Sequence, residues 1–279
     1  MDRRRHIPRI CFLLTVGLTL LGVVLRSVCM LCLFDVDPGY FTPGLLPTVS
    51  DLLYFVAVLV PTVCMILTPK DALSPEPRAP RRLPFALLIG LALTAFTIIS
   101  LLICFPTRKS NMMIAPSLLG LLASTYYFIS ANRDGRYPDP LSFVGYLPVF
   151  WNIAAVAETY FDNYTTMNSP IKISLHMGFL GFMMINMAEL RVRVGKPAPR
   201  YSVAFLSIGS YACLVGSVPL LLALWAGTLN NLRQALFAAV LLAAGLYGLY
   251  LLLRYSHSPA PVPTTPSEEP TPETANNAE

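Results

Sequence analysis

Three ionisable side chains interrupt apolar stretches of this sequence, where charged groups are normally avoided. Arg26, Glu158 and His176 each lie in or beside a run of hydrophobic residues. An ionisable residue within an apolar span is energetically costly, and it usually pairs with another charge or faces a polar cavity. A histidine also changes its charge near neutral pH, which would permit proton coupling. Two interpretations stay open: a binding site for a polar or charged solute, or a buried Arg26–Glu158 ion pair that fixes helix packing.

Further polar residues accompany these three. Asn152, Glu158 and Asp162 recur at steps that place them on one face of a helix. The segment AETYFDNYTTMNSPIK, residues 157–172, then leads into the next apolar run, and its Ser-Pro pair is typical of a helix start. We therefore expect a short turn here. The candidate ligand-binding residues are Arg26, Asp51, Asn152, Glu158, Asp162, Lys172 and His176.

Metal binding and catalysis are the other chemistries to weigh. The acidic residues and His176 offer oxygen and nitrogen ligands for a divalent ion, namely Asp35, Asp37, Asp51, Glu158 and Asp162. The spacing in FDVDPG does not match a calcium loop, so a solvated acidic turn is preferred, and no metal or cofactor is expected. The six cysteines, including an isolated CxxC at Cys29 and Cys32, are interpreted as small buried hydrophobic residues. No HExxH, GxSxG, Walker or dinucleotide motif occurs, which favours a non-enzymatic protein with no catalytic residue assigned.

Membrane-spanning helices must position these residues. Of 279 residues, 55% are hydrophobic and 13% are charged, whereas a soluble domain carries about 25% charged residues. A helix needs about 20 apolar residues to cross a bilayer. The sequence therefore predicts an all-α, polytopic helix bundle within residues 1–256. Its eight expected spans lie near residues 10–33, 50–68, 84–105, 113–131, 141–161, 171–190, 201–226 and 233–254.

The distribution of basic residues predicts the orientation of these spans. With the N-terminus inside, 15 of the 20 Lys and Arg residues fall on the inner side, and both termini are cytoplasmic. The outer side keeps Arg108, Lys109, Lys172 and Arg233, while Arg26 lies within the first span. Because the positive charge follows the loops, topology explains the net charge of +5 better than nucleic acid does, so no nucleic-acid partner is expected.

Two features of chain organisation complete the prediction. Residues 257–279 are rich in Pro, Thr and Glu and have little to bury, so we expect a disordered cytoplasmic tail. The segments 79–90 (APRRLPFALLIG) and 198–209 (APRYSVAFLSIG) match at six of twelve positions. A parallel 4+4 repeat would follow if this match reflects a duplication, and repeats of that kind are common in transporters.

The segments YFDNYTTMNSPIK and AELRVRVGKPAPR resemble a pattern found in uncharacterised multi-pass membrane proteins of bacteria. The resemblance implies a location in the bacterial plasma membrane and no particular activity. Three functional hypotheses remain: a permease-like or solute-binding protein with a polar site in the outer leaflet, a non-catalytic subunit or sensor that binds a protein partner, and an intramembrane enzyme. The enzyme would act on lipid or envelope precursors, with Glu158 or His176 as acid or base.

Overall fold

The computed structural model describes residues 7–35, 37, 39–68, 84–108, 111–132, 143–162, 165–166 and 168–257. Long helices account for most of them, as the composition predicts. The helices are α1 (Ile7–Cys32), α2 (Leu45–Leu67), α3 (Pro84–Ile99), α4 (Phe105–Arg108), α5 (Ile114–Asn132), α7 (Leu147–Phe161), α8 (Pro170–Arg193), α9 (Pro199–Trp225) and α10 (Leu232–His257). A π-helix, η3 (Ser100–Cys104), continues α3, and 3₁₀ turns η4 (Asn111–Met113) and η5 (Phe143–Tyr146) precede α5 and α7. The strands β1 (Phe34–Asp35) and β2 (Tyr40–Phe41) form a small antiparallel hairpin.

Seven of the helices among the described residues are long and apolar enough to cross a membrane. They correspond to the first four and the last three expected spans, and they indicate a multi-pass membrane protein. The remaining expected span, 141–161, coincides with η5 and the 15-residue helix α7. An α-helix of that length covers about 22 Å, so the eighth crossing stays a prediction. The expected tail, apart from His257, lies outside the described residues.

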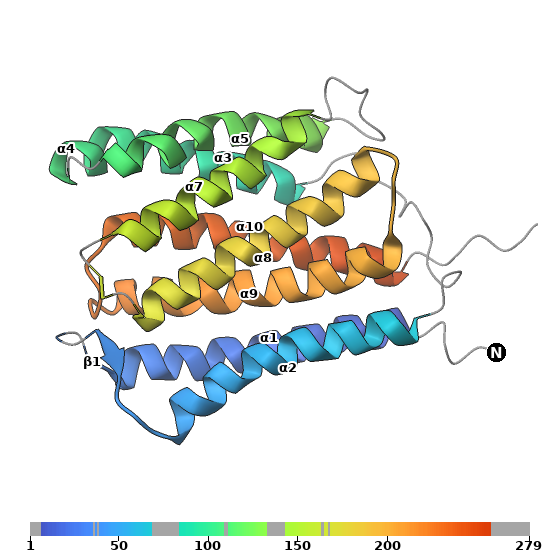
Figure 1. Ribbon diagram of the computed structural model, residues 1–279, viewed down its shortest axis with the longest axis horizontal. Coiled ribbons are helices and arrows are strands. Elements are labelled where there is room, and N and C mark those ends of the chain that lie inside the picture. The colour runs from blue at the N-terminus through green and yellow to red at the C-terminus, as the bar shows by residue number, and fades with distance from the viewer. Residues whose placement is uncertain are drawn as a thin grey trace, which may run out of the picture.

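The helices run along one common direction and form layers (Figure 1). The pair α1 and α2 forms one outer layer, α8, α9 and α10 lie in the middle, and α3, α5 and α7 lie on the opposite side. The start of α1 and the end of α10 lie at the same end, which we call the terminal end. The other end carries β1 and β2, and we call it the hairpin end. The sidedness of these ends in a membrane and the 4+4 repeat stay predictions.

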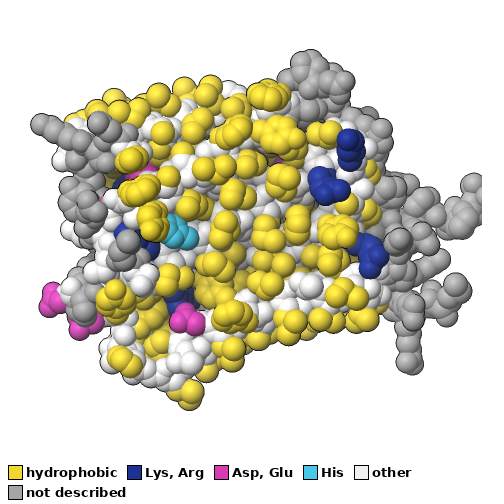
Figure 2. Space-filling model, viewed as in Figure 1, with side chains coloured by type: hydrophobic (Ala, Val, Ile, Leu, Met, Phe, Trp, Pro, Cys, Tyr) yellow, Lys and Arg dark blue, Asp and Glu magenta, His cyan; other side chains and the backbone are white. Residues whose placement is uncertain are grey.

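The surface of the bundle is largely apolar (Figure 2). Hydrophobic side chains cover most of the face shown, and basic side chains are visible near both ends. On α2 the exposed apolar residues follow a helical stripe that includes Leu52, Phe55 and Leu59. Such a surface suits lipid chains rather than water.

Small residues allow α8 and α9 to pack closely in the middle layer. A Cβ atom built on Gly209 would lie 2.5 Å from the Gly181 carbonyl oxygen, and one on Gly216 would lie 2.5 Å from the Ser174 carbonyl oxygen. Glycines of α8 and α9 therefore let two helix backbones come together, as small residues commonly do in membranes. This contact fixes the position of α8, which carries Ser174, a hydrogen-bond partner of Arg26.

We predict that Gly209→Ala destabilises the protein strongly, because the added methyl group would collide with backbone that cannot move alone. The cost should be about 1–3 kcal/mol, measured as the free energy of unfolding in detergent. Gly17→Ala in α1 is the matched control, since a Cβ there meets nothing within 4 Å. It should leave stability unchanged or raise it by up to about 1 kcal/mol, because alanine is the better helix former. Equal effects of the two substitutions would contradict the close-packing interpretation.

Candidate functional site

Two buried arginines, Arg26 and Arg233, organise the polar residues near the hairpin end. Arg26 is 1% exposed and Arg233 is 4% exposed. Arg26 pairs with Asp51, whereas Glu158 pairs with Arg233. The predicted Arg26–Glu158 ion pair is therefore wrong. Arg26 and Glu158 each form an ion pair, but with a different residue from the one predicted. In both cases the partner lies on another helix, and the spacing of residues along the chain does not identify it.

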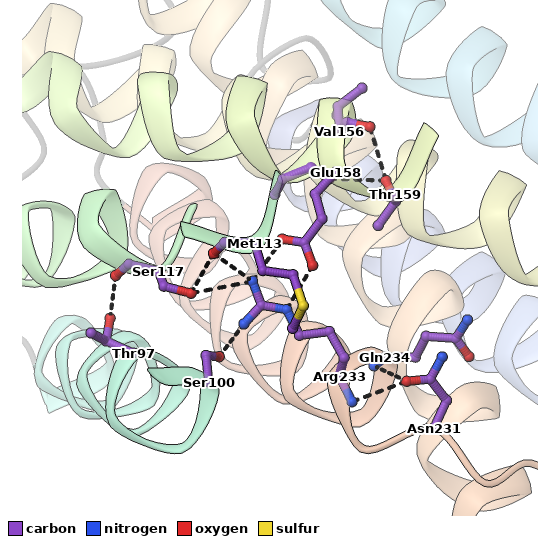
Figure 3. Close-up of polar contacts among 11 residues, drawn as sticks. Thr97, Ser100, Met113, Ser117, Val156, Glu158, Thr159, Asn231, Arg233 and Gln234 are labelled. Atoms are coloured by element: carbon purple, nitrogen blue, oxygen red, sulfur yellow. Dashed lines mark hydrogen bonds and ion pairs between the residues drawn. The ribbon is translucent and has the colours of Figure 1, made fainter. Parts of the chain in front are cut away.

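The Glu158–Arg233 pair is bidentate and closely supported (Figure 3). Arg233 Nε donates to Glu158 Oε1 at 2.7 Å, and Arg233 Nη2 donates to Glu158 Oε2 at 2.6 Å. The same guanidinium donates to the hydroxyls of Ser100 and Ser117. Its carbon lies 4.3 Å from the centre of the Phe96 ring. A planar guanidinium is well suited to this combination of fork-like hydrogen bonding and stacking.

Local structure brings these groups together from four parts of the chain. Asn231 Oδ1 accepts from the backbone N–H of Arg233 at 3.1 Å and so caps the start of α10. The π-helix η3 begins at Ser100, and a π-bulge of this kind often marks a functional or strained position. Thr97 donates to the Ser117 carbonyl at 2.9 Å, which ties α3 to α5. The network therefore joins α3, α5, α7 and α10 through one arginine.

Arg26 has a different and less complete set of partners. Its Nη1 donates to Asp51 Oδ1 at 2.7 Å, and its Nη2 donates to Ser174 Oγ at 3.2 Å. The Phe41 ring, from the hairpin, lies 4.7 Å from the guanidinium carbon. The Asp51 side chain is 62% exposed, so a buried cation is paired with an exposed carboxylate. The buried Nε of Arg26 has no hydrogen-bond partner.

Two tyrosines extend this arrangement toward the membrane interior. The Tyr211 hydroxyl of α9 lies against Gly22, about one turn before Arg26 in α1, and Tyr54 follows Asp51 by three residues in α2. Their rings pack edge to face at 5.4 Å, and both hydroxyl oxygens are buried without a hydrogen-bond partner. We call Arg26, Asp51, Tyr54, Ser174 and Tyr211 the Arg26 cluster. Its unused Arg26 N–H and tyrosine O–H groups are hydrogen-bond donors, so the cluster is chemically suited to an anionic oxygen.

The other candidate residues have local partners. Lys172 Nζ donates to the carbonyls of Asp162 at 2.6 Å and Tyr160 at 3.3 Å, where it binds the carboxyl end of α7. Asp162 Oδ2 accepts from Thr165 at 3.2 Å. His176 Nε2 lies 2.9 Å from Thr159 Oγ1.

Asn152 is fully buried in α7, and its Nδ2 donates to the Pro148 carbonyl one turn earlier, at 2.8 Å. These contacts are those of side chains that stabilise helix ends and helix packing.

Sequence reasoning missed Arg233, Tyr54 and Tyr211. The sequence predicts Arg233 only as a basic residue on the outer side, at the start of the last span, and the two tyrosines have no distinguishing spacing. Near the terminal end, Glu189 forms an ion pair within α8, with Arg193 Nη2 at 3.4 Å from Glu189 Oε1. Among the described residues, all six cysteines are free and no cluster of three or more His, Cys, Asp or Glu residues could hold a metal.

We predict that neutralising either partner of the Glu158–Arg233 pair destabilises the protein by about 3–5 kcal/mol, because the other charge stays buried. Glu158→Gln, Arg233→Gln and the double variant would be compared by unfolding in mixed micelles. The double variant should lose clearly less than the sum of the two single losses. Lys196→Gln, at an exposed loop position, serves as the control. Additive losses would show that the pair is not energetically coupled.

Comparison with known proteins does not add an activity to this geometry. No protein-family model, no curated protein and no solved structure matches the chain.

Proposed function

We propose that this protein is a permease-like or solute-binding membrane protein whose ligand presents an oxyanion group to Arg26. One observation carries the proposal: a guanidinium that is 1% exposed keeps a buried Nε without a partner, beside two buried tyrosine hydroxyls that also lack one. Unsatisfied polar groups are expensive in the membrane interior, where water is scarce. A ligand oxyanion that accepts from these groups would remove that penalty.

The chemistry of the Arg26 cluster favours an anion over a neutral or cationic ligand. Arginine offers only donors, and a tyrosine hydroxyl donates readily to a carboxylate or phosphate. Hydrogen bonds to charged acceptors are about twice as strong as neutral ones. The exposed Asp51 carboxylate already occupies part of the guanidinium fork at 2.7 Å. A ligand oxyanion would therefore bind in the manner of this side chain.

The position of the Arg26 cluster between layers supports a permease-like mechanism. Arg26 and Asp51 belong to the outer pair α1 and α2, whereas Ser174 and Tyr211 belong to the middle layer (Figure 1). A small apolar cluster, distinct from the main core, joins these layers through Leu53, Ala57, Tyr211 and Val215. A limited shift of α1 and α2 against α8 and α9 would alter access to the site. Glu158, in contrast, is held in a closed network, which argues against its use as an acid or base.

We predict that small carboxylates or phosphate esters raise the melting temperature of the purified protein. At 100 times the dissociation constant a ligand adds about 2.7 kcal/mol, which corresponds to roughly 5 °C or more. Wild type would be compared with Arg26→Lys, Tyr211→Phe and the control Lys196→Gln against a panel of anions, cations and neutral solutes.

The Tyr211→Phe variant makes this test specific. Because the Tyr211 hydroxyl is buried without a partner, its removal should leave the ligand-free protein as stable as wild type or more stable. The ligand-induced shift should nevertheless fall in this variant and remain unchanged in Lys196→Gln. A panel in which no anion stabilises wild type, or in which Tyr211→Phe responds like wild type, would contradict the proposal.

A further inference from the structure

We infer that the ligand of the Arg26 cluster is an aminophospholipid, which places its phosphate on Arg26 and its primary ammonium on Asp51. This inference rests on the proposed function and adds two elements to it: the ligand reaches the site from the bilayer, and its headgroup is zwitterionic. The first element follows from where Asp51 lies on α2. The second follows from the two opposite charges that the site presents side by side.

Asp51 lies at the edge of the exposed face of α2, where it contacts the buried Arg26 at 2.7 Å and still exposes most of its side chain. The Asp51 side chain is 62% exposed. Three exposed apolar residues lie nearby on α2: Leu52 (58%) is the next residue, Phe55 (73%) is one turn further on, and Leu59 (62%) is two turns further on. Residues at steps of three and four share one face of a helix. Asp51 is thus a carboxylate at the edge of an apolar stripe that suits lipid chains. The hydrocarbon chains of a lipid could lie on this stripe while the headgroup contacts Asp51.

The hairpin covers the cluster on another side. Phe41 of β2 lies over the Arg26 guanidinium at 4.7 Å, and Phe34 packs against Phe41 with ring centres 6.1 Å apart. Arg26 lies about 9 Å from the end of α1, and Asp51 lies about 9 Å from the start of α2, at 1.5 Å per residue. Both charges are therefore near the depth of lipid headgroups and glycerol if these helix ends meet the membrane surface. Lateral entry beside Asp51 fits this arrangement better than entry past the aromatic pair.

The charges of the site select a zwitterion over a simple anion. An anion that binds Arg26 approaches Asp51, whose carboxylate repels it, because the two side chains are only 2.7 Å apart. A headgroup that carries an ammonium next to its phosphate would neutralise Asp51 while it replaces Asp51 on the guanidinium. A primary ammonium donates three hydrogen bonds, whereas the quaternary ammonium of choline donates none. Phosphatidylethanolamine should therefore bind more tightly than phosphatidylcholine or phosphatidylglycerol.

The test is competitive binding of lipids with identical acyl chains to the delipidated full-length protein in mixed micelles, read by native mass spectrometry. Wild type should prefer phosphatidylethanolamine over phosphatidylcholine by about tenfold, the equivalent of one charge-assisted hydrogen bond. Asp51→Asn should abolish this preference and shift binding toward phosphatidylglycerol. Asp35→Asn removes an equivalent exposed charge from the hairpin and should leave the preference unchanged. Tyr211→Phe should weaken the binding of every lipid tested, because each of them carries a phosphate and the variant lacks the hydroxyl that would donate to it.

Free O-phosphoethanolamine and inorganic phosphate, run in the same assay, separate this inference from the proposed function. If these soluble anions bind in a Tyr211-dependent manner and the lipids do not, the lipid inference is overturned and the oxyanion site stands. If phosphatidylglycerol competes best in wild type, or if Asp51→Asn keeps the wild-type preference, the zwitterion assignment is overturned. If neither soluble anions nor lipids bind, the inference and the proposed function both fail.

Discussion

Placing a guanidinium inside an apolar bundle imposes the strictest demand in this molecule, because arginine stays charged and the bilayer interior supplies almost no water. The protein contains two such groups near its hairpin end. Around Arg233 the demand is met completely, by a bidentate carboxylate, two hydroxyls and two aromatic rings. Around Arg26 it is met in part, by a carboxylate that is itself exposed and by one hydroxyl and one carbonyl at longer range.

This difference corresponds to a difference in the architecture. The Arg233 network ties α10 to α3, α5 and α7, so a charge buried at the start of α10 holds one side of the bundle together. The glycine contacts of α8 and α9 hold the middle layer at close range. The layer of α1 and α2 is attached by the Arg26 cluster, by a small separate apolar cluster, and by Cys11, Met30 and Cys64, which belong to the main core. Arg233, which has more hydrogen-bond partners, thus joins helices within one side of the bundle, whereas Arg26 lies where two layers meet.

The sequence predicted the elements better than it predicted their partners. Hydrophobic runs marked the spanning helices because a bilayer demands a minimum apolar length. The Glu189–Arg193 pair is four residues apart within one helix, so a contact of this kind can be read from sequence spacing alone. The partner of Glu158 cannot be read in this way, since Arg233 is 75 positions away and helix neighbours are chosen by packing. Tyr54 and Tyr211 gave no signal, because membrane helices contain many tyrosines with purely structural roles.

The difference in surroundings between Arg26 and Arg233 indicates which of the two arginines can exchange its carboxylate partner. Separating Glu158 from Arg233 would leave two charges in a dry environment, each 4–8% exposed, and such a separation is strongly unfavourable. Separating Asp51 from Arg26 leaves the carboxylate largely exposed, so the penalty is confined to the arginine. An incoming oxyanion removes that penalty as it arrives, because it takes the place of the carboxylate on the guanidinium. Exchange at Arg26 is therefore a substitution of one oxyanion for another, and it leaves the Glu158–Arg233 pair in place.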